Sequence, residues 1–334
     1  MTGCMVMNDK RKRCDEKPLV SVILIAYNQR RYIRQAIESV LAQETSFPYE
    51  LLIGDDASDD GTSDIVAEYA RAYPDIIKAF IRPENVGAAR NAVLLLQQAR
   101  GELIASLEGD DYWIDPRKLE KQAAFLRESP GFIGCTSRIR CVDENGCAIR
   151  GKPEWIRQKR VFTLADFDGV HLPGQASSLM RRNIFRAPSH DYSVLTEADT
   201  MISDRTAMLI FLLQGDFYCF DQPMSVYRYV PALQGGNVTS QLAGEASIVR
   251  DVQITRAMER YAYEEFGRRI VFSRFRRELY AKAWVRAVLG RSETMQGEAA
   301  QLRGEDGGWC CVVLLPLELI KLTWRRCVRR LRSL

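Results

Sequence analysis

The stretch Ala105-Ser106-Leu107-Glu108-Gly109-Asp110-Asp111-Tyr112-Trp113 decides the fold prediction, because an apolar run ends there in two adjacent carboxylates. In an open α/β sheet, ligands bind beyond the carboxyl ends of the strands. Neighbouring carboxylates repel each other unless a cation or strong donors lie between them. The pair therefore indicates a divalent metal that carries a phosphate. Taken alone, the pair is more typical of an acidic turn, and the rest of the N-terminal half reverses that preference.

Short β-rich runs alternate with helical patterns before and within this stretch. The runs cover residues 19–26, 50–54, 76–81 and 103–107, and the helical patterns cover residues 31–43, 63–72 and 86–98. This alternation predicts right-handed βαβ units and therefore an α/β fold with a mostly parallel sheet flanked by helices. Polar clusters follow the predicted strands, so we expect them to meet at one edge of the sheet.

Three motifs in this half of the chain occur in a characteristic order. They are Val22-Ile23-Leu24-Ile25-Ala26-Tyr27-Asn28, then Asp55-Asp56-Ala57-Ser58-Asp59-Asp60-Gly61-Thr62, then Glu108-Gly109-Asp110-Asp111 followed by Pro116, Leu119 and Gln122. With this order and spacing, the chain from Pro18 to Ser240 resembles family 2 glycosyltransferases. The resemblance implies the GT-A fold and transfer of a sugar from a nucleoside-diphosphate donor, with UDP the usual nucleotide.

The resemblance implies a nucleotide site at the ends of the first two strands. The base and ribose would contact Ala26, Tyr27, Asn28 and Asp56. An aromatic face can stack on a base, and a carboxylate can accept from a ring N–H. For Tyr27 the alternative is a half-buried aromatic at the edge of the sheet.

Arg90 follows Asn85-Val86-Gly87 at a predicted helix start, as in the nucleotide-binding segment of the family. A helix N-terminus favours anions, and an arginine adds charge-assisted hydrogen bonds. We therefore expect Arg90 to contact the nucleotide. A surface salt bridge is the alternative.

The resemblance assigns the metal to the acidic motif. Asp111 is the leading ligand, and Asp110 would bind the metal or the ribose. The expected ion is Mg²⁺ or Mn²⁺, which would bridge both phosphates and offset charge on the leaving nucleoside diphosphate.

The family places its general base at a helix start beyond the metal motif, which implies Asp204 here, with Asp199 and Glu197 in reserve. Asp204 also fits an acidic first turn of a helix, which is its structural alternative. A single base and no enzyme nucleophile imply inversion at the anomeric carbon.

One departure from the family follows Tyr227-Arg228, where many members have a histidine two residues further on and this chain has Tyr229-Val230-Pro231. The chain has only two histidines, His171 and His190, which argues against histidine-based metal cages and Ser-His-Asp chemistry. His171 would face an acceptor sugar or be an ordinary loop residue.

Composition limits the alternatives. The net charge is only +4, so the chain lacks the strongly basic composition of proteins that bind nucleic acids. Its nine cysteines are scattered and include no CxxC pair, which suggests reduced thiols in the cytoplasm. No glycine-rich turn follows the first strand, which argues against a dinucleotide-dependent oxidoreductase.

The predicted organisation is a disordered lead over 1–17, a catalytic domain over 18–240, a basic helical extension over 241–303 and an amphipathic basic tail over 304–334. The tail carries apolar residues and then six basic residues, a pattern of peripheral attachment to anionic lipid. Packing of the tail on the domain is the alternative.

The sequence thus predicts an inverting, metal-dependent glycosyltransferase at the inner face of the plasma membrane. Its acceptor would be a saccharide or a lipid-linked saccharide, and its role the synthesis of a surface polysaccharide. The competing hypothesis is a catalytically inactive GT-A scaffold that binds carbohydrate or nucleotide.

Overall fold

The computed structural model describes residues 17–151, 153–199, 204–230 and 248–279. The chain divides into two compact units, Met1–Leu242 and Ala243–Leu334. Residues 1–16 of the expected lead and the whole expected tail over 304–334 lie outside the described residues, and the predicted domain boundaries remain predictions.

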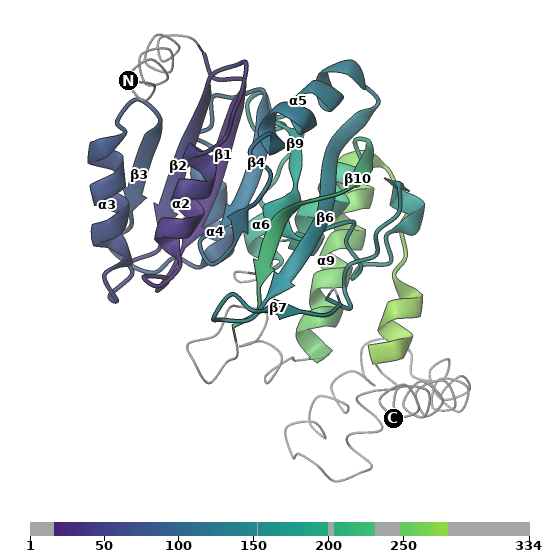
Figure 1. Cartoon of the computed structure of the whole chain (residues 1–334). Coiled ribbons are helices and arrows are strands. Elements are labelled where there is room, and N and C mark those ends of the chain that lie inside the picture. The colour runs from purple at the N-terminus through teal and green to yellow at the C-terminus, as the bar shows by residue number, and fades with distance from the viewer. Residues whose placement is uncertain (1–16, 152, 200–203, 231–247, 280–334) are drawn as a thin grey trace. The chain divides into compact units, whose positions relative to one another are not determined.

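The first unit is built on a mixed sheet of ten strands with the order β3-β2-β1-β4-β9-β6-β10-β5, to which β7 and β8 add at the side (Figure 1). The strands are β1 (Val20–Ala26), β2 (Tyr49–Asp55), β3 (Ile77–Ile81), β4 (Leu103–Glu108), β5 (Tyr112–Trp113), β6 (Phe132–Val142), β7 (Ala148–Ile149), β8 (Val161–Phe162), β9 (Met180–Arg182) and β10 (Asp216–Arg228).

Helices alternate with the strands as the sequence pattern predicts. The α-helices of this unit are α2 (Ile33–Leu41), α3 (Thr62–Ala72), α4 (Ala88–Leu96), α5 (Lys118–Glu128), α6 (Val194–Glu197) and α7 (Asp204–Leu212), and two 3₁₀ turns are η1 (Leu164–Asp166) and η2 (Ala176–Ser178). The α/β fold with helix-flanked parallel strands is therefore confirmed.

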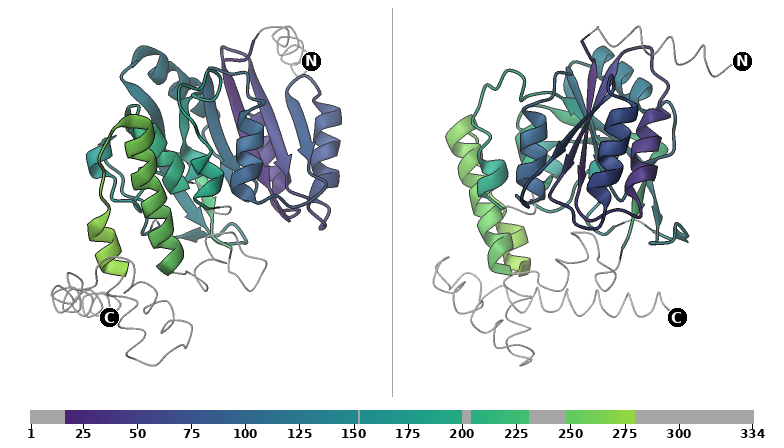
Figure 2. Two further views of the ribbon diagram at one scale, coloured as in Figure 1. Left: turned by 180° about the vertical axis from the view of Figure 1, so that it is seen from behind. Right: turned by 90° about the vertical axis from the view of Figure 1, so that its left-hand side faces the viewer.

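Two apolar layers hold the sheet between its helices. Alternate residues of a strand face opposite sides, so β1 sends Val22 and Leu24 toward α2 and α3 but Ile23 toward α4. All three side chains are buried, which explains why β1 reads as a continuous apolar run. Figure 2 shows helices on both faces of these strands.

Register brings the strand ends together. In the parallel pairs, Ala26 of β1 lies opposite Asp55 of β2, and Ile25 lies opposite Glu108 of β4. The polar turns after the three strands therefore meet at one edge, as expected from their order.

In the second unit the structure describes α9 (Ile248–Phe266) and helical residues 273–279. Glu259 Oε1 joins them by accepting from the Phe272 backbone over 2.5 Å and from Arg276 Nη1 over 2.7 Å. No helix among the described residues is both long and apolar enough to cross a bilayer.

Candidate active site

An acidic cluster lies at the carboxyl end of β4. Glu108 ends the strand, and Asp110 and Asp111 follow in a turn closed by a hydrogen bond from the Asp111 backbone N–H to the Glu108 carbonyl. One carboxylate oxygen from each of the three residues lies within 4.8 Å of the others. The structure thus adds Glu108 to the two ligands that the sequence suggested.

Burial makes this cluster costly in the charged state. It raises the pKa of Asp111 and Glu108 well above their ordinary values, with neighbouring carboxylates adding to both shifts. Burial also raises the pKa of Asp110 to about 6. Three crowded carboxyl groups of this kind form a donor set that a divalent cation would stabilise, since carboxylate oxygens are what Mg²⁺ and Mn²⁺ prefer.

Two residues of the η2 turn hold the acidic cluster from one side. Gln175 Nε2 donates to Glu108 Oε2 over 2.6 Å and to Asp111 Oδ2 over 2.8 Å. Ser177 Oγ donates to the same Asp111 oxygen over 2.6 Å. These donors favour the charged form of Asp111 and so oppose the effect of its burial.

Arg228 holds the cluster from the other side. Its backbone N–H donates to Asp111 Oδ1 over 2.8 Å, and its Nε donates to the Asp110 carbonyl over 2.9 Å. Its guanidinium is buried, lies 4.5 Å from the Tyr32 ring centroid and donates to Gln35 Oε1. Arg228 therefore ties the end of β10 to the metal motif.

Sequence reasoning gave no role to Gln175, Ser177 or Arg228. They lie 64, 66 and 117 residues from Asp111, so no local spacing connects them with it. Their only sequence signal was membership of segments that resemble the family after the metal motif.

The predicted nucleotide residues lie at the ends of β1 and β2. Ala26 is buried, whereas Tyr27 is 50 % exposed, which fits both a free stacking face and an aromatic at the edge of the sheet. Asn28 has a positive φ of 52° and donates its backbone N–H to Ser58 Oγ. This link holds the β1 turn against the β2 turn.

Asp56 is a buried carboxylate at the start of the turn after β2. Its two oxygens accept from the backbone N–H groups of Val86 and Gly87 over 2.8 and 3.0 Å. It thereby fixes the loop that leads into α4, a role that sequence reasoning did not foresee.

Arg90 lies in the first turn of α4 with its side chain exposed. It forms no hydrogen bond or ion pair with the residues that the structure describes, so the alternative of a surface salt bridge finds no support among them.

Asp204 is the first described residue of α7, where solvent reaches its side chain. The surrounding protein nevertheless raises the pKa of its carboxyl by desolvation, against an opposing effect of Arg205. Its charge in turn contributes to the raised pKa of Glu108, which places Asp204 near the acidic cluster. The structure thus brings the predicted base and the predicted metal ligands to one region.

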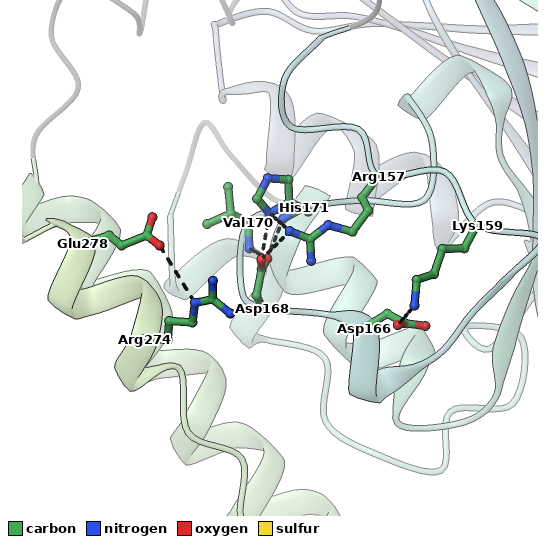
Figure 3. A network of polar contacts seen from close by, with 8 residues as sticks. All are labelled: Arg157, Lys159, Asp166, Asp168, Val170, His171, Arg274 and Glu278. Atoms are coloured by element: carbon green, nitrogen blue, oxygen red, sulfur yellow. Dashed lines mark hydrogen bonds and ion pairs between the residues drawn. The ribbon is translucent and has the colours of Figure 1, made fainter. Parts of the chain in front are cut away.

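His171 belongs to a separate polar network, in which both it and Arg157 point toward the Asp168 carboxylate (Figure 3). His171 Nδ1 lies 2.7 Å from Asp168 Oδ2, and Arg157 Nη2 lies 3.3 Å from the same oxygen. The backbone N–H groups of Val170 and His171 each donate to Asp168 Oδ1, so the network fixes the loop over residues 168–171.

Comparison with solved structures shows the fold. The S. aureus protein TarS, residues 1–349 in complex with UDP-GlcNAc, superposes with a TM-score of 0.58 at 18 % identity, over 86 % of this chain and 80 % of that chain. The mannosyltransferase PcManGT of Pyrobaculum calidifontis, in complex with GDP-Man and Mn²⁺, gives a TM-score of 0.50 at 16 % identity, over 96 % and 94 %. The fold of this chain is the GT-A fold.

Comparison of sequences shows the family. The uncharacterized protein Rv1520 of Mycobacterium tuberculosis is 32 % identical over 94 % of this chain and 88 % of its own length. The Bacillus subtilis protein TuaG, named as a teichuronic acid biosynthesis glycosyltransferase, is 44 % identical over 34 % of this chain and 43 % of its length. The model of the family described as glycosyl transferase family 2 matches residues 21–187. The chain therefore belongs to glycosyl transferase family 2.

Proposed function

We propose that this protein is an inverting, metal-dependent glycosyltransferase that moves a sugar from a UDP-linked donor to a saccharide or lipid-linked saccharide acceptor. The observation that carries the proposal is the acidic cluster of Glu108, Asp110 and Asp111 with Asp204 close to it. These groups supply a cation site and a proton acceptor in one place, which are the two requirements of such a transfer.

The donor nucleotide would bind across the ends of β1 and β2. Tyr27 offers an exposed ring for the base, Ala26 and Asn28 offer the backbone of the β1 end, and Asp56 holds the loop from which α4 and Arg90 start. Arg90 would pair with an anionic part of the nucleotide, because its guanidinium is exposed at a helix N-terminus.

Mg²⁺ or Mn²⁺ would be held by Asp111 and Asp110, with Glu108 as a further carboxylate. Two structural neighbours, PcManGT and GalNAc-T7, have structures in complex with Mn²⁺. When bound, the ion would neutralise charge on the diphosphate leaving group. Gln175, Ser177 and Arg228 orient the carboxylates before any ligand arrives.

Asp204 would accept the proton of the acceptor hydroxyl as that oxygen attacks the anomeric carbon from the face opposite the diphosphate. The bond from the acceptor oxygen to the anomeric carbon forms while the bond to the diphosphate breaks, so the configuration inverts. The raised pKa of Asp204 makes its carboxylate a stronger base than an ordinary aspartate.

The proposed cellular setting rests on one relative and on the sequence of the C-terminal tail. TuaG is named for teichuronic acid biosynthesis, which suggests a surface polysaccharide as the product here too. We place the protein in the cytoplasm with peripheral membrane contact through residues 304–334, which lie outside the described part of the chain. Deletion of 309–334 followed by cell fractionation tests that contact, and unchanged membrane association would exclude it.

The direct test of function is calorimetric titration with UDP and with GDP, each with and without Mn²⁺. The wild type is compared with Asp111→Asn, which keeps the shape of the side chain, and with Asp221→Asn, whose side chain is 88 % exposed on β10. We expect Mn²⁺-dependent UDP binding that is lost in Asp111→Asn alone. Nucleotide binding without turnover of any UDP-sugar would favour the inactive scaffold, and no binding of either nucleotide would overturn the proposal.

A further inference from the structure

The carboxamide of Gln29 lies between the end of β1 and the acidic motif. Gln29 follows the turn of Tyr27 and Asn28, and its Oε1 packs on the bare Cα of Gly109: a Cβ built on Gly109 would lie only 2.2 Å from this oxygen and 3.2 Å from the Ala26 Cβ. A glycine at position 109 therefore leaves the room that the Gln29 side chain occupies.

This carboxamide has no conventional hydrogen-bond partner among the described residues. Gln29 Oε1 is buried without a donor, and the described hydrogen bonds of this residue are all made by its backbone. The N–H donates to Thr62 Oγ1 over 2.8 Å, and the carbonyl accepts from the backbone N–H groups of Tyr32 and Ile33. The side-chain oxygen has only the Cα–H of Gly109 as a weak donor. Because the side chain as a whole is partly exposed, its Nε2 remains available to a ligand. Unpaired polar groups at a protein interior are uncommon and are often completed by a ligand or water.

The position of Gln29 matches the middle of a nucleotide. Tyr27, proposed for the base, precedes Gln29 by two residues, and Asp56 is joined to the same strand end by its backbone N–H, which donates to the Ala26 carbonyl. Asp110 and Asp111, proposed for the metal and diphosphate, follow Gly109, on which the Gln29 side chain packs. In every nucleoside diphosphate, the ribose joins those two parts. We infer that Gln29 binds a ribose hydroxyl of the donor nucleotide through its carboxamide. This inference rests on the proposed function and adds a specificity residue to it.

The chemistry favours a hydroxyl over a phosphate oxygen at this position. A hydroxyl can accept from Nε2 and donate to Oε1, so it pairs with the carboxamide in either orientation of the amide. A phosphate oxygen only accepts, and three carboxylates at the neighbouring turn already mark where a cation and a diphosphate would lie.

The test removes the side-chain amide and the ribose hydroxyl separately and together, and measures nucleotide affinity by calorimetry in the presence of Mn²⁺. The ligands are UDP, GDP and the 2′-deoxy and 3′-deoxy forms of each. The proteins are the wild type and Gln29→Met, which keeps the length of the side chain but has no amide. We expect the wild type to bind one deoxy form about three- to tenfold more weakly than the parent nucleotide. Gln29→Met should bind the parent more weakly by a similar factor and no longer distinguish it from that deoxy form.

Gly109→Ala provides an independent variant, because its methyl group would push the Gln29 oxygen from its place without needing a positive φ. It should show the same loss of discrimination, and the double variant should lose nothing further. Gln98→Met, on an exposed side chain, is the matched control. Equal discrimination in the wild type and Gln29→Met would overturn the ribose contact while leaving the proposed function intact. A wild type that binds neither nucleotide would overturn both.

Discussion

Gln175 Nε2 donates to Asp111 Oδ2 over 2.8 Å and, from the same nitrogen, to Glu108 Oε2 over 2.6 Å. One neutral amide thus holds two carboxylates that would otherwise repel each other. The contact crosses from the η2 turn to the end of β4, so the geometry of the acidic cluster depends on a segment far away in the sequence.

We expect Gln175→Ala to weaken Mn²⁺ binding, measured in the presence of UDP, by about tenfold or more. Loss of the amide removes the group that orients both carboxylates toward a common point. Gln222→Ala, on the exposed part of β10, is the control and should bind Mn²⁺ like the wild type. An unchanged Mn²⁺ affinity in Gln175→Ala would show that Glu108 and Asp111 hold their positions without it.

Asp204→Asn tests the base. Donor hydrolysis, in which water replaces the acceptor, should slow by a factor of about 10² to 10⁴ while Mn²⁺–UDP affinity stays constant, because a base acts on the attacking hydroxyl and not on the nucleotide. The low-pH decline of the wild-type rate should occur above the pH typical of an aspartate, since desolvation by the surrounding protein raises the pKa of the Asp204 carboxyl.

The control for Asp204→Asn is Asp64→Asn, which removes an exposed acidic residue from the first turn of α3. It tests the alternative that Asp204 serves only as an acidic residue of a helix start. If the two variants hydrolyse the donor equally well, Asp204 is not the base.

The sequence predicted those elements whose own residues show the pattern of a strand or a helix. The apolar β-rich runs of β1, β2 and β4 each end in a polar turn, and parallel strands place those turns at one edge, so the placement of Asp56, Asp110 and Asp111 at the same edge of the sheet could be predicted. The residues that hold the acidic cluster in place could not be predicted. Arg228 reaches Asp111 through the pairing of β10 with β6 and β5, and strand order of this kind leaves no periodic signal.

The hydrogen-bond partners of individual site residues could not be predicted either. The oxygens of Asp56 accept from the backbone of the loop before α4, and no sequence pattern shows which backbone groups lie within reach of a side chain. The roles of Ala26, Tyr27, Asn28, Asp56 and Arg90 toward a nucleotide remain predictions that binding measurements must decide.

Ala57→Gly should stabilise the protein. Ala57 has a φ of 60°, a left-handed conformation that costs a residue with a Cβ roughly 1 kcal/mol. The greater freedom of glycine in the unfolded chain offsets part of the gain. We expect the midpoint of thermal unfolding to rise by about 1 to 3 °C, measured by calorimetry. A lower midpoint would mean that the turn carries no such strain.

Arg90→Ala should weaken UDP binding by roughly tenfold, the effect of losing a charge-assisted hydrogen bond, and leave thermal stability unchanged. The side chain is exposed and makes no contact with the described residues that folding would need. Arg127→Ala, also exposed on a helix, is the matched control for net charge. If both variants reduce UDP affinity equally, the effect is one of overall charge and Arg90 makes no specific contact.

Lys118, at the start of α5, is a buried amine and gives a pH-dependent prediction. It is fully buried, lies 4.4 Å from the Trp113 ring centroid and donates to Gln122 Oε1 over 2.6 Å. Burial lowers the pKa of Lys118 to about 7, so between pH 7 and 10.5 the unfolded chain binds a proton that the folded protein lacks. The free energy of unfolding should therefore rise with pH across that window and be lowest below it.

Lys118→Met removes the titrating group while filling a similar volume. Its stability relative to the wild type should be greatest near pH 6 and should fall steadily toward pH 10, because only the wild type gains stability as the pH rises. Urea unfolding at several pH values measures the difference. The hydrogen bond to Gln122 and the contact with Trp113 are lost at every pH, so they shift the curve without changing its slope. A difference independent of pH would show that Lys118 keeps an ordinary pKa in the folded protein despite its burial.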